Sequence, residues 1–238
     1  MIRKLIRNIV LKEKASSDKY IAFLRRKGVS VGNNVKFYSP LNCMIDISSP
    51  WLISIGDFVR ITHGVIILTH DYSWSVIKQL PDCKGRITGA QQAVTIGNNV
   101  FIGMNAVVTR GVTIGNNVII GAGSVVTKDC ESNSVYAGNP AVKIMTIQEY
   151  AQKRLSKQYE EAKELALNYK DKFKKEPPIE IFSEYFTLFC TAAQAQANPR
   201  FLTQLKTGGN YEDSIAYINS HPPMFNGYEE FLDSCFKR

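Results

Sequence analysis

His70 is the side chain of this sequence best placed for acid–base chemistry. It is one of three histidines in the 238-residue chain and stands in the segment IILTHDYS, directly before a sequence repeat is interrupted. An imidazole titrates near neutral pH, so its neutral form can take a proton from a reacting group. A lone histidine often has a structural role instead, and the residue type alone leaves both interpretations open. His70 is therefore a candidate general base.

The remaining histidines and the cysteines do not form a recognisable metal site. His63 lies seven residues before His70, and His221 precedes two prolines. The cysteines are scattered, odd in number and without C-x-x-C spacing: Cys43, Cys83, Cys130, Cys190 and Cys235. This arrangement predicts neither a metal site nor a disulfide framework. Free thiols favour a reducing compartment, so we expect a cytoplasmic protein.

The segment after His70 is a polar insertion. Ile67 and Ile96 are 29 residues apart, which is not a multiple of six, and the residues between them are rich in polar and turn-forming types. We predict a loop over about 72–92 that projects from a repeat scaffold, where functional residues are often placed. The candidate substrate-binding residues are Asp71, Tyr72 and Trp74, which follow His70 directly. The two aromatic rings suit a sugar face and suit a small local core equally well.

The element that must position these residues is a six-residue repeat. Residues 96–129 read IGNNVF-IGMNAV-VTRGVT-IGNNVI-IGAGSV-VTKD, and an aliphatic residue opens each unit: Ile96, Ile102, Val108, Ile114, Ile120 and Val126. A second small or β-branched residue follows four places later: Val100, Ala106, Val112, Val118 and Ser124. Neither the helical nor the strand period produces this spacing. The pattern predicts a solenoid in which each unit is a short strand and a turn, and stacked units share one core.

The same register extends upstream in degenerate form. Its predicted opening positions are Val31, Phe37, Cys43, Ser49, Ile55, Ile61 and Ile67, and its second inward positions are Val35, Leu41, Ile47, Ile53, Val59 and Val65. Cys43 is thereby predicted to be buried. The Gly-Asn-Asn triplets at 97–99 and 115–117 are predicted to form corners, because glycine and asparagine tolerate left-handed backbone angles.

This stretch resembles the left-handed parallel β-helix of the hexapeptide-repeat acyltransferases, the class that includes galactoside, maltose and streptogramin acetyltransferases. The likeness rests on the hexads and on the ending IIGAGSVVTKD followed by YAGNPAVKI, and it covers about residues 31–145. It implies a mainly β fold, acetyl-CoA as co-substrate, no metal, and a homotrimer in which a neighbouring subunit completes the cleft. A histidine directly before the extended loop is the general base in that family, which implies this role for His70.

The resemblance also implies where acetyl-CoA binds. The matching positions are Phe101, Gly103, Met104, Ala122, Thr127, Lys128 and Lys143. Backbone amides at Met104 and Ala122 would hold the pantetheine arm, and Lys128 the nucleotide phosphates. Gly103 and Ala122 also have a purely structural interpretation as corner residues. Two positions depart from the pattern: Phe101 stands where many relatives have Trp, and a valine separates Lys143 from the preceding Pro-Ala pair.

General-base catalysis requires that the second ring nitrogen of the histidine has a partner of its own. For His70 the sequence offers Asp71 or a backbone carbonyl. Backbone N–H groups near a coil corner are candidates for stabilising the oxyanion of the tetrahedral intermediate. No serine or cysteine nucleophile is needed, because direct transfer in a ternary complex relies on orienting the two substrates.

The net charge of +8 is concentrated at the N-terminus. Residues 1–27 contain nine lysines and arginines against two acidic residues. Aliphatic residues recur at helical spacing within 1–12, which predicts a basic amphipathic helix, and a second helix is predicted over about 17–27. The first helix either caps the solenoid or lies on an anionic membrane surface. Nucleic-acid binding is not indicated, because no nucleic-acid motif accompanies the charge.

The C-terminal part of the chain is predicted to be helical. Thr146 and Glu149 form a capping box that opens a helix to about Lys175, before two prolines. Further helices are predicted over 179–197 and 211–220 and in the segment YEEFLDSCF. The predicted organisation is therefore N-terminal helices in 1–30, a β-helix domain in 31–145 and a helical extension in 146–238.

We expect an acetyl-CoA-dependent O-acetyltransferase that acts on a hydroxyl of a sugar or cell-surface polysaccharide precursor. The alternative enzyme acetylates xenobiotics or an amino-sugar nitrogen, and the alternative from another class is a non-catalytic β-helix scaffold. No apolar run approaches the roughly 18 residues of a membrane span, and no secretory signal pattern opens the chain. The protein would contact the inner membrane surface peripherally if residues 1–12 are not a cap.

Overall fold

The computed structural model describes residues 11–237, and the chain divides into two compact units, Met1–Tyr150 and Ala151–Arg238. The predicted amphipathic helix over 1–12 lies outside the described residues except for its last two. The short 3₁₀ turn η1 (Lys12–Ala15) is followed by α2 (Ser17–Lys27). Ser16 caps this helix by accepting a hydrogen bond from Lys19 N, and Gly28 ends it at φ 109°.

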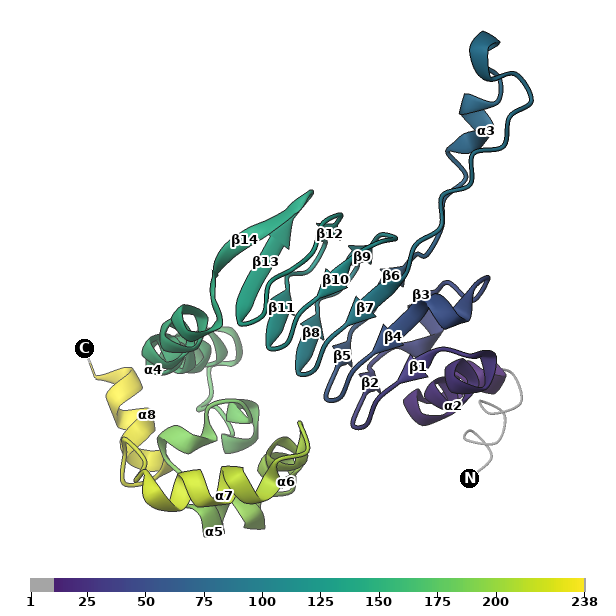
Figure 1. The fold of residues 1–238 in the computed structure, drawn as a ribbon. Coiled ribbons are helices and arrows are strands. Elements are labelled where there is room, and N and C mark those ends of the chain that lie inside the picture. Colours follow the sequence, from purple (N-terminus) through teal and green to yellow (C-terminus); the bar gives the residue numbers. More distant parts are fainter. Residues whose placement is uncertain (1–10, 238) are drawn as a thin grey trace. The chain divides into compact units, whose positions relative to one another are not determined.

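The first unit is a solenoid of short parallel strands, in which each coil passes through three sheets (Figure 1). Sheet A contains β1 (Ser30–Val31), β4 (Ile53–Ile55), β7 (Val94–Ile96) and β10 (Thr113–Ile114). Sheet B contains β2 (Lys36–Phe37), β5 (Arg60–Ile61), β8 (Val100–Ile102), β11 (Val118–Ile120), β13 (Ser134–Gly138) and β14 (Ala141–Thr146). Sheet C contains β3 (Met44–Ile45), β6 (Ile66–Ile67), β9 (Val107–Val108) and β12 (Val125–Val126). This is the left-handed parallel β-helix that the hexads predict.

The hexads set both the length of a coil and its core. Ile96 pairs with Ile114, so strand partners in the regular part lie 18 residues, or three hexads, apart. The opening residues from Ile96 to Val126 are at most 2% exposed. The second inward positions, from Val100 to Ser124, are buried as well. Burial of both positions in every unit confirms the predicted core of the regular coils.

The corners are formed as predicted, although the two residue types have different roles. Asn99 and Asn117 have the left-handed angles, with φ 54° and 55°. Gly97 is required for another reason, because a Cβ there would lie 2.7 Å from the backbone oxygen of Gly115 in the next coil. Asn99 Nδ2 donates to Asn117 Oδ1 at 2.9 Å, which continues the stacking along the corner.

The first coil differs from the predicted register. Cys43 and Ser49 were predicted to open hexads, but neither does. The opening residues of this part of the chain are Phe37, Ile45 and Ile55, as their strand pairing with the second coil shows. These three residues are eight and ten residues apart instead of six, since the 3₁₀ turns η2 (Pro40–Asn42) and η3 (Pro50–Leu52) lengthen two corners. The predicted inward residues Leu41 and Ile47 are consequently 53% and 41% exposed. Cys43 is buried, but two residues before the opening residue Ile45, at the second inward position in line with Val65.

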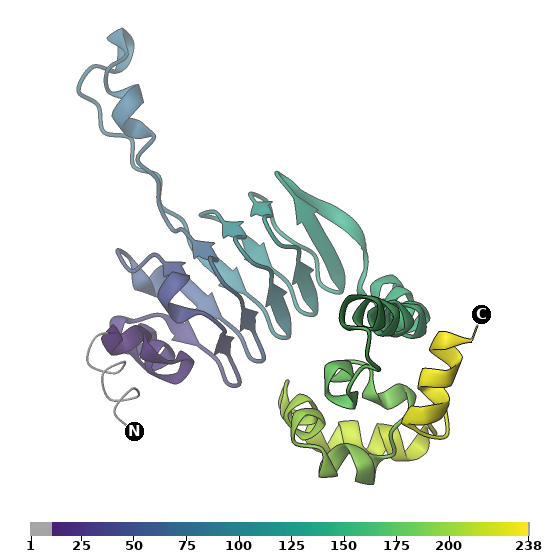
Figure 2. The same cartoon turned by 180° about the vertical axis from the view of Figure 1, so that it is seen from behind.

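A long arm leaves the solenoid between the second and third coils, and both views show it projecting from the stack (Figures 1 and 2). Ile67 and Val108 are partners 41 residues apart, which is 23 more than in the regular coils. The arm contains α3 (Trp74–Ile77) and the turn η4 (Pro81–Cys83). Its base is closed where Gln92 N donates to Thr69 O at 3.0 Å and Asp71 N donates to Ala90 O at 3.3 Å.

The ends of the solenoid are covered by other elements. At the first coil, α2 packs on β1 and β2 (Figure 2). At the last coil, β14 returns antiparallel to β13 and leads into α4 (Ile147–Phe173). Thr146 and Glu149 form the predicted capping box, since Thr146 N donates to Glu149 Oε2 at 2.7 Å and Glu149 N donates to Thr146 Oγ1 at 3.2 Å.

The second unit is helical and has a core of its own. After α4 come η5 (Ile179–Phe182), η6 (Phe186–Leu188), α5 (Ala192–Ala197), α6 (Pro199–Lys206), α7 (Tyr211–Ser220) and α8 (Tyr228–Phe236). Aromatic side chains form much of this core, with Phe182, Phe189 and Phe231 fully buried. The helix α6 was missing from the sequence prediction. In residues 11–237, no helix has the length and apolar character needed to cross a bilayer.

Candidate active site

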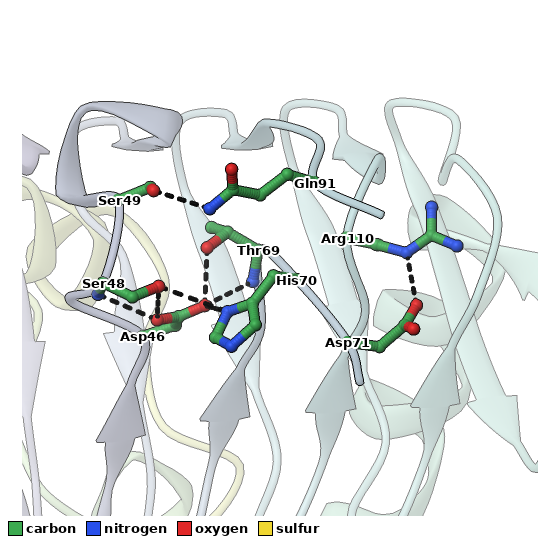
Figure 3. Close-up of polar contacts among 8 residues, drawn as sticks. All are labelled: Asp46, Ser48, Ser49, Thr69, His70, Asp71, Gln91 and Arg110. Atoms are coloured by element: carbon green, nitrogen blue, oxygen red, sulfur yellow. Dashed lines mark hydrogen bonds and ion pairs between the residues drawn. The ribbon is translucent and has the colours of Figure 1, made fainter. Parts of the chain in front are cut away.

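His70 follows β6 at the corner between sheets C and A, and an aspartate from the preceding coil holds its ring (Figure 3). Asp46 follows β3 in that coil, and its Oδ2 lies 2.6 Å from His70 Nδ1. Ser48 Oγ lies 3.2 Å from the same nitrogen. The contact with a carboxylate assigns the hydrogen of the neutral ring to Nδ1, which donates it to Asp46. His70 Nε2 then keeps its lone pair for a substrate.

Asp46 is fixed by the chain around it. Its side chain is 7% exposed, and Oδ2 accepts a hydrogen bond from Thr69 N at 3.0 Å. Oδ1 accepts a hydrogen bond from Ser48 N at 3.0 Å. Burial by itself raises the pKa of Asp46, but the hydrogen bonds from Thr69 and Ser48 outweigh burial and hold the pKa below its usual range. Asp46 is therefore a fixed carboxylate that can stabilise a protonated imidazole.

Asp71 has a different partner from the one suggested by the sequence. Arg110 Nε donates to Asp71 Oδ2 at 2.7 Å, and Arg110 Nη1 donates to Gln92 Oε1 at 2.8 Å. Hydrogen bonds from Ser73 and Arg110 lower the pKa of Asp71. Successive side chains of an extended segment point in opposite directions, so Asp71 turns away from His70 Nδ1 (Figure 3). The suggestion that Asp71 orients the base was therefore wrong, and Asp46 has that position.

A cavity of about 450 Å³ lies beside His70, at the corners of three consecutive coils. It is lined by Leu68, His70, Asp71, Gln92, Thr109, Arg110, Gly111 and Thr127. The structure thus brings together three of the predicted site residues, His70, Asp71 and Thr127. The cavity places an imidazole near a guanidinium and hydroxyl groups, an arrangement that can bind polar groups next to a proton acceptor.

The two predicted aromatic acceptor residues lie at the start of the arm. The Tyr72 ring packs edge-on against the His70 ring, with centroids 5.5 Å apart, and Tyr72 is 67% exposed. Trp74 begins α3, and its ring centroid lies 5.8 Å from that of Tyr72. Lys78 Nζ lies 5.5 Å from the Trp74 ring centroid. The three rings of His70, Tyr72 and Trp74 therefore form a continuous row from the base into the arm.

Within a single chain, most of the residues predicted to bind acetyl-CoA lie away from the cavity beside His70. Phe101 points outward from sheet B, is 40% exposed, and lines a separate cavity of about 270 Å³. Gly103, Met104 and Ala122 form the corner between sheets B and C. A Cβ on Gly103 would lie 2.5 Å from Ala122 N, which gives Gly103 a structural role in close stacking.

The two predicted lysines also differ in position. Lys128 follows β12 beside Thr127, at the same corner as His70, and is exposed. Lys143 lies in β14 and donates to Glu131 Oε2 at 2.9 Å. The predicted binding roles of both lysines stay predictions.

Two side chains of the candidate site, Asp46 and Arg110, were absent from the sequence prediction. Asp46 lies 24 residues before His70, and the lengthened corners of the first coil concealed that the two residues follow neighbouring paired strands of sheet C, β3 and β6. Arg110 could have been predicted. It stands two residues after Val108, just as the predicted residue Lys128 stands two residues after Val126, the strand partner of Val108. Within residues 11–237, no group of three histidine, cysteine or acidic side chains is arranged to hold a metal ion.

A parallel solenoid of three sheets with hexad coils, carrying a histidine–aspartate pair at a corner, has the architecture of a hexapeptide-repeat transferase. Residues 93–128 match the family described as bacterial transferase hexapeptide (six repeats). The chain is 44% identical over 147 residues to Protein CapG of Staphylococcus aureus, an alignment that covers 61% of this chain and 80% of that protein. The chain belongs to the hexapeptide-repeat acyltransferase family.

Solved structures of named acetyltransferases are also similar. The hexapeptide-repeat acetyltransferase VCA0836 of Vibrio cholerae matches with a TM-score of 0.46 and 24% identity, over 60% of this chain and 86% of that one. It has also been solved in complex with acetyl coenzyme A. A maltose O-acetyltransferase of Clostridium difficile 630 matches with a TM-score of 0.41 and 30% identity, over 60% of this chain and 81% of that one.

Proposed function

We propose that this chain transfers an acetyl group from acetyl-CoA to a hydroxyl of a sugar or of a cell-surface polysaccharide precursor, with His70 as the general base. The observation that carries the proposal is the 2.6 Å contact between His70 Nδ1 and Asp46 Oδ2. It leaves His70 Nε2 as a proton acceptor beside the cavity. Membership of the acyltransferase family supports the reaction class.

The residues of this chain account for the proton transfers of the reaction. His70 Nε2 takes the proton of the acceptor hydroxyl as its oxygen attacks the thioester carbonyl carbon. Asp46 stabilises the imidazolium that forms. When the carbon–sulfur bond breaks, His70 returns the proton to the departing thiolate. Direct transfer needs no covalent enzyme intermediate, because both substrates are held against the same base.

The proposed acetyl-CoA site uses the residues predicted for it, contributed by two copies of the chain. Thr127 and Lys128 lie at the corner of His70, whereas Gly103, Met104 and Ala122 lie at the opposite edge of sheet C. Threefold assembly would bring the second group of one copy to the first group of the next. Phe101 and Lys143 would then contact more distant parts of the coenzyme.

The outer surface of sheet C supports assembly through this face. The outward residues of its four strands are all apolar: Met44, Ile66, Val107 and Val125. The corresponding residues of sheet A are all hydroxyl-bearing: Ser30, Ser54, Thr95 and Thr113. A sheet whose outward residues are all apolar marks an interaction surface. A second copy of this chain is the proposed partner of sheet C.

The row of rings formed by His70, Tyr72 and Trp74 supports a sugar as the acceptor, since exposed aromatic rings pack on the apolar face of a sugar. A location in the cytoplasm, and peripheral contact of residues 1–12 with an anionic membrane surface, complete the proposal. The membrane contact is motivated by the basic amphipathic pattern of that segment.

The test of the proposed function is the release of free thiol from acetyl-CoA in the presence of sugar acceptors. His70→Asn is expected to lower kcat by about 10²-fold or more, while acetyl-CoA binding and Tm change little. His63→Asn is the matched control, because His63 lies in the same solenoid and its Nδ1 contacts Ser39 Oγ at 3.3 Å instead of a carboxylate. Full turnover in His70→Asn would contradict the assignment, and no turnover in the wild type with any acceptor would favour the scaffold alternative.

A further inference from the structure

The helical unit has a cavity of its own, of about 470 Å³, between η6, α6 and α7. Its floor is apolar and formed by Phe186, Leu205 and Ile218, which are at most 7% exposed. The Phe186 ring stacks on the buried Phe201 ring with centroids 4.9 Å apart. The floor is therefore part of a packed core, and its volume lies within the range of cavities that bind small ligands.

The rim of this cavity is polar. It is formed by Thr187, Gln204, Asn210, Asp213, Ser214 and Tyr217. In the part of the chain that the structure describes, the side chains of Thr187, Gln204 and Asp213 make no hydrogen bond or ion pair. Their hydroxyl, amide and carboxylate groups are available to a ligand, and together they offer both donors and acceptors.

Tyr217 supplies an aromatic surface at the same rim. Its ring is 54% exposed and stacks on the His221 ring, with centroids 4.1 Å apart and an angle of 16° between the planes. His221 is held in turn, since its Nδ1 lies 3.0 Å from Tyr217 O. The Tyr217 ring is thus supported on one side and presented to solvent beside the cavity.

We infer that this cavity binds a neutral saccharide unit. A pyranose has an apolar face of C–H groups, which suits the Tyr217 ring and the floor. Each of its hydroxyls both donates and accepts a hydrogen bond, which suits the amide of Gln204 and the hydroxyl of Thr187, while the Asp213 carboxylate accepts. The carboxylates of Asp213 and its neighbour Glu212 disfavour a phosphate or another anion. A wholly apolar ligand would leave the polar rim without partners.

Saccharide binding in this cavity does not depend on the proposed acetyl transfer, because the cavity belongs to the helical unit and His70 to the solenoid. Its role as a second saccharide site, which holds another residue of a polymeric acceptor, rests on the proposed function. The extension 151–238 would then contribute to the choice of acceptor without contributing to the chemistry.

The test uses saturation-transfer NMR of the full chain with methyl glycosides of glucose, galactose, mannose and N-acetylglucosamine as probes. At least one probe is expected to bind. Tyr217→Ala is expected to weaken that binding by about tenfold through loss of the ring surface. Asp213→Asn is expected to weaken it by about threefold or more. Glu212→Gln is the matched control on the same helix, and it is expected to bind as the wild type does.

Two further variants, Gln204→Ala and His70→Asn, complete the test. Gln204→Ala changes an exposed rim residue and should also weaken binding with an unchanged Tm, which covers the case that Tyr217→Ala destabilises the unit. His70→Asn should leave the saccharide binding that depends on Tyr217 unchanged. A failure of the proposed acetyl transfer can therefore be told apart from a failure of this inference. Absence of binding by the wild type, or binding that Tyr217→Ala and Gln204→Ala do not affect, overturns the inference.

Discussion

Asp46 has both carboxylate oxygens in use, which makes it a positioning residue for His70. One oxygen contacts His70 Nδ1 and Thr69, and the other accepts from Ser48. An asparagine at this position would offer an amide group with one donor side and one acceptor side. Its N–H₂ group would favour the tautomer of His70 with the hydrogen on Nε2, which is unable to accept a proton.

Asp46→Asn is therefore expected to lower kcat by about 10²-fold, with little change in the KM for acetyl-CoA. The measurement is steady-state thiol release at saturating acetyl-CoA. Asp82→Asn, which changes an exposed carboxylate in the arm, is the control and should retain wild-type kcat. Wild-type turnover in Asp46→Asn would show that His70 does not depend on this partner.

The lowered pKa of Asp46 also makes a prediction about stability. A carboxyl whose pKa is lower in the folded state adds to the free energy of unfolding above its ordinary value of about 3.8, and this contribution is lost as the pH falls through the folded pKa. The difference in Tm between the wild type and Asp46→Asn should be larger at pH 7 than at pH 3. Thermal unfolding at the two pH values measures it, and a difference that grows on acidification would contradict the assigned charge.

At the residue scale, the sequence singled out His70 but not the carboxylate that contacts it. His70 stands where the hexads are interrupted, a feature visible in one dimension, and its role as the base stays a prediction. Asp46 was not, because its contact depends on how many residues the first coil contains. Asp71 was a false candidate only as the partner of His70, since adjacency in sequence does not bring two side chains of an extended segment together.

At the scale of elements, a substitution that disturbs the close stacking of the coils should lower the free energy of unfolding. Gly103→Ala places a methyl group 2.5 Å from Ala122 N, and the backbone of the neighbouring coil has little room to move. We expect a loss of about 1–3 kcal/mol in the free energy of unfolding, measured by denaturant titration. Gly89→Ala in the arm, where no atom lies within 4 Å of the added Cβ, should be near neutral. Equal stability of the two variants would show that the corner can relax.

The regular coils were predicted residue by residue, whereas the first coil was not. From Ile96 to Val126 every inward position has a suitable side chain, and the length of a coil follows from counting. In the first coil, the prolines Pro40 and Pro50 begin 3₁₀ turns that add residues to corners, and Leu41 and Ile47 happened to fit the extrapolated pattern. A six-residue period does not reveal an insertion when apolar residues occur on both sides of it.

At the scale of the whole molecule, the contrast between sheets A and C predicts the oligomeric state. The wild type is expected to be a trimer by light scattering. Val107→Glu, in the centre of the apolar face of sheet C, should give monomers, because it places a charge in the proposed interface. Thr95→Glu, at the equivalent outward position of sheet A, should leave the trimer intact. A monomeric wild type at micromolar concentration, or a trimeric Val107→Glu, would contradict assembly through sheet C.

The arm between the second and third coils has a consequence for how such chains diversify. Closing a loop of 41 residues instead of 18 costs only about 0.7 kcal/mol more in chain entropy, because this cost grows with the logarithm of loop length. The corner that carries His70 can therefore accept insertions of very different lengths while the stacked strands on both sides keep their pairing. The segment beside His70 can thus be exchanged almost independently of the scaffold. Under the proposed function, a new acceptor would require a new arm and not a new fold.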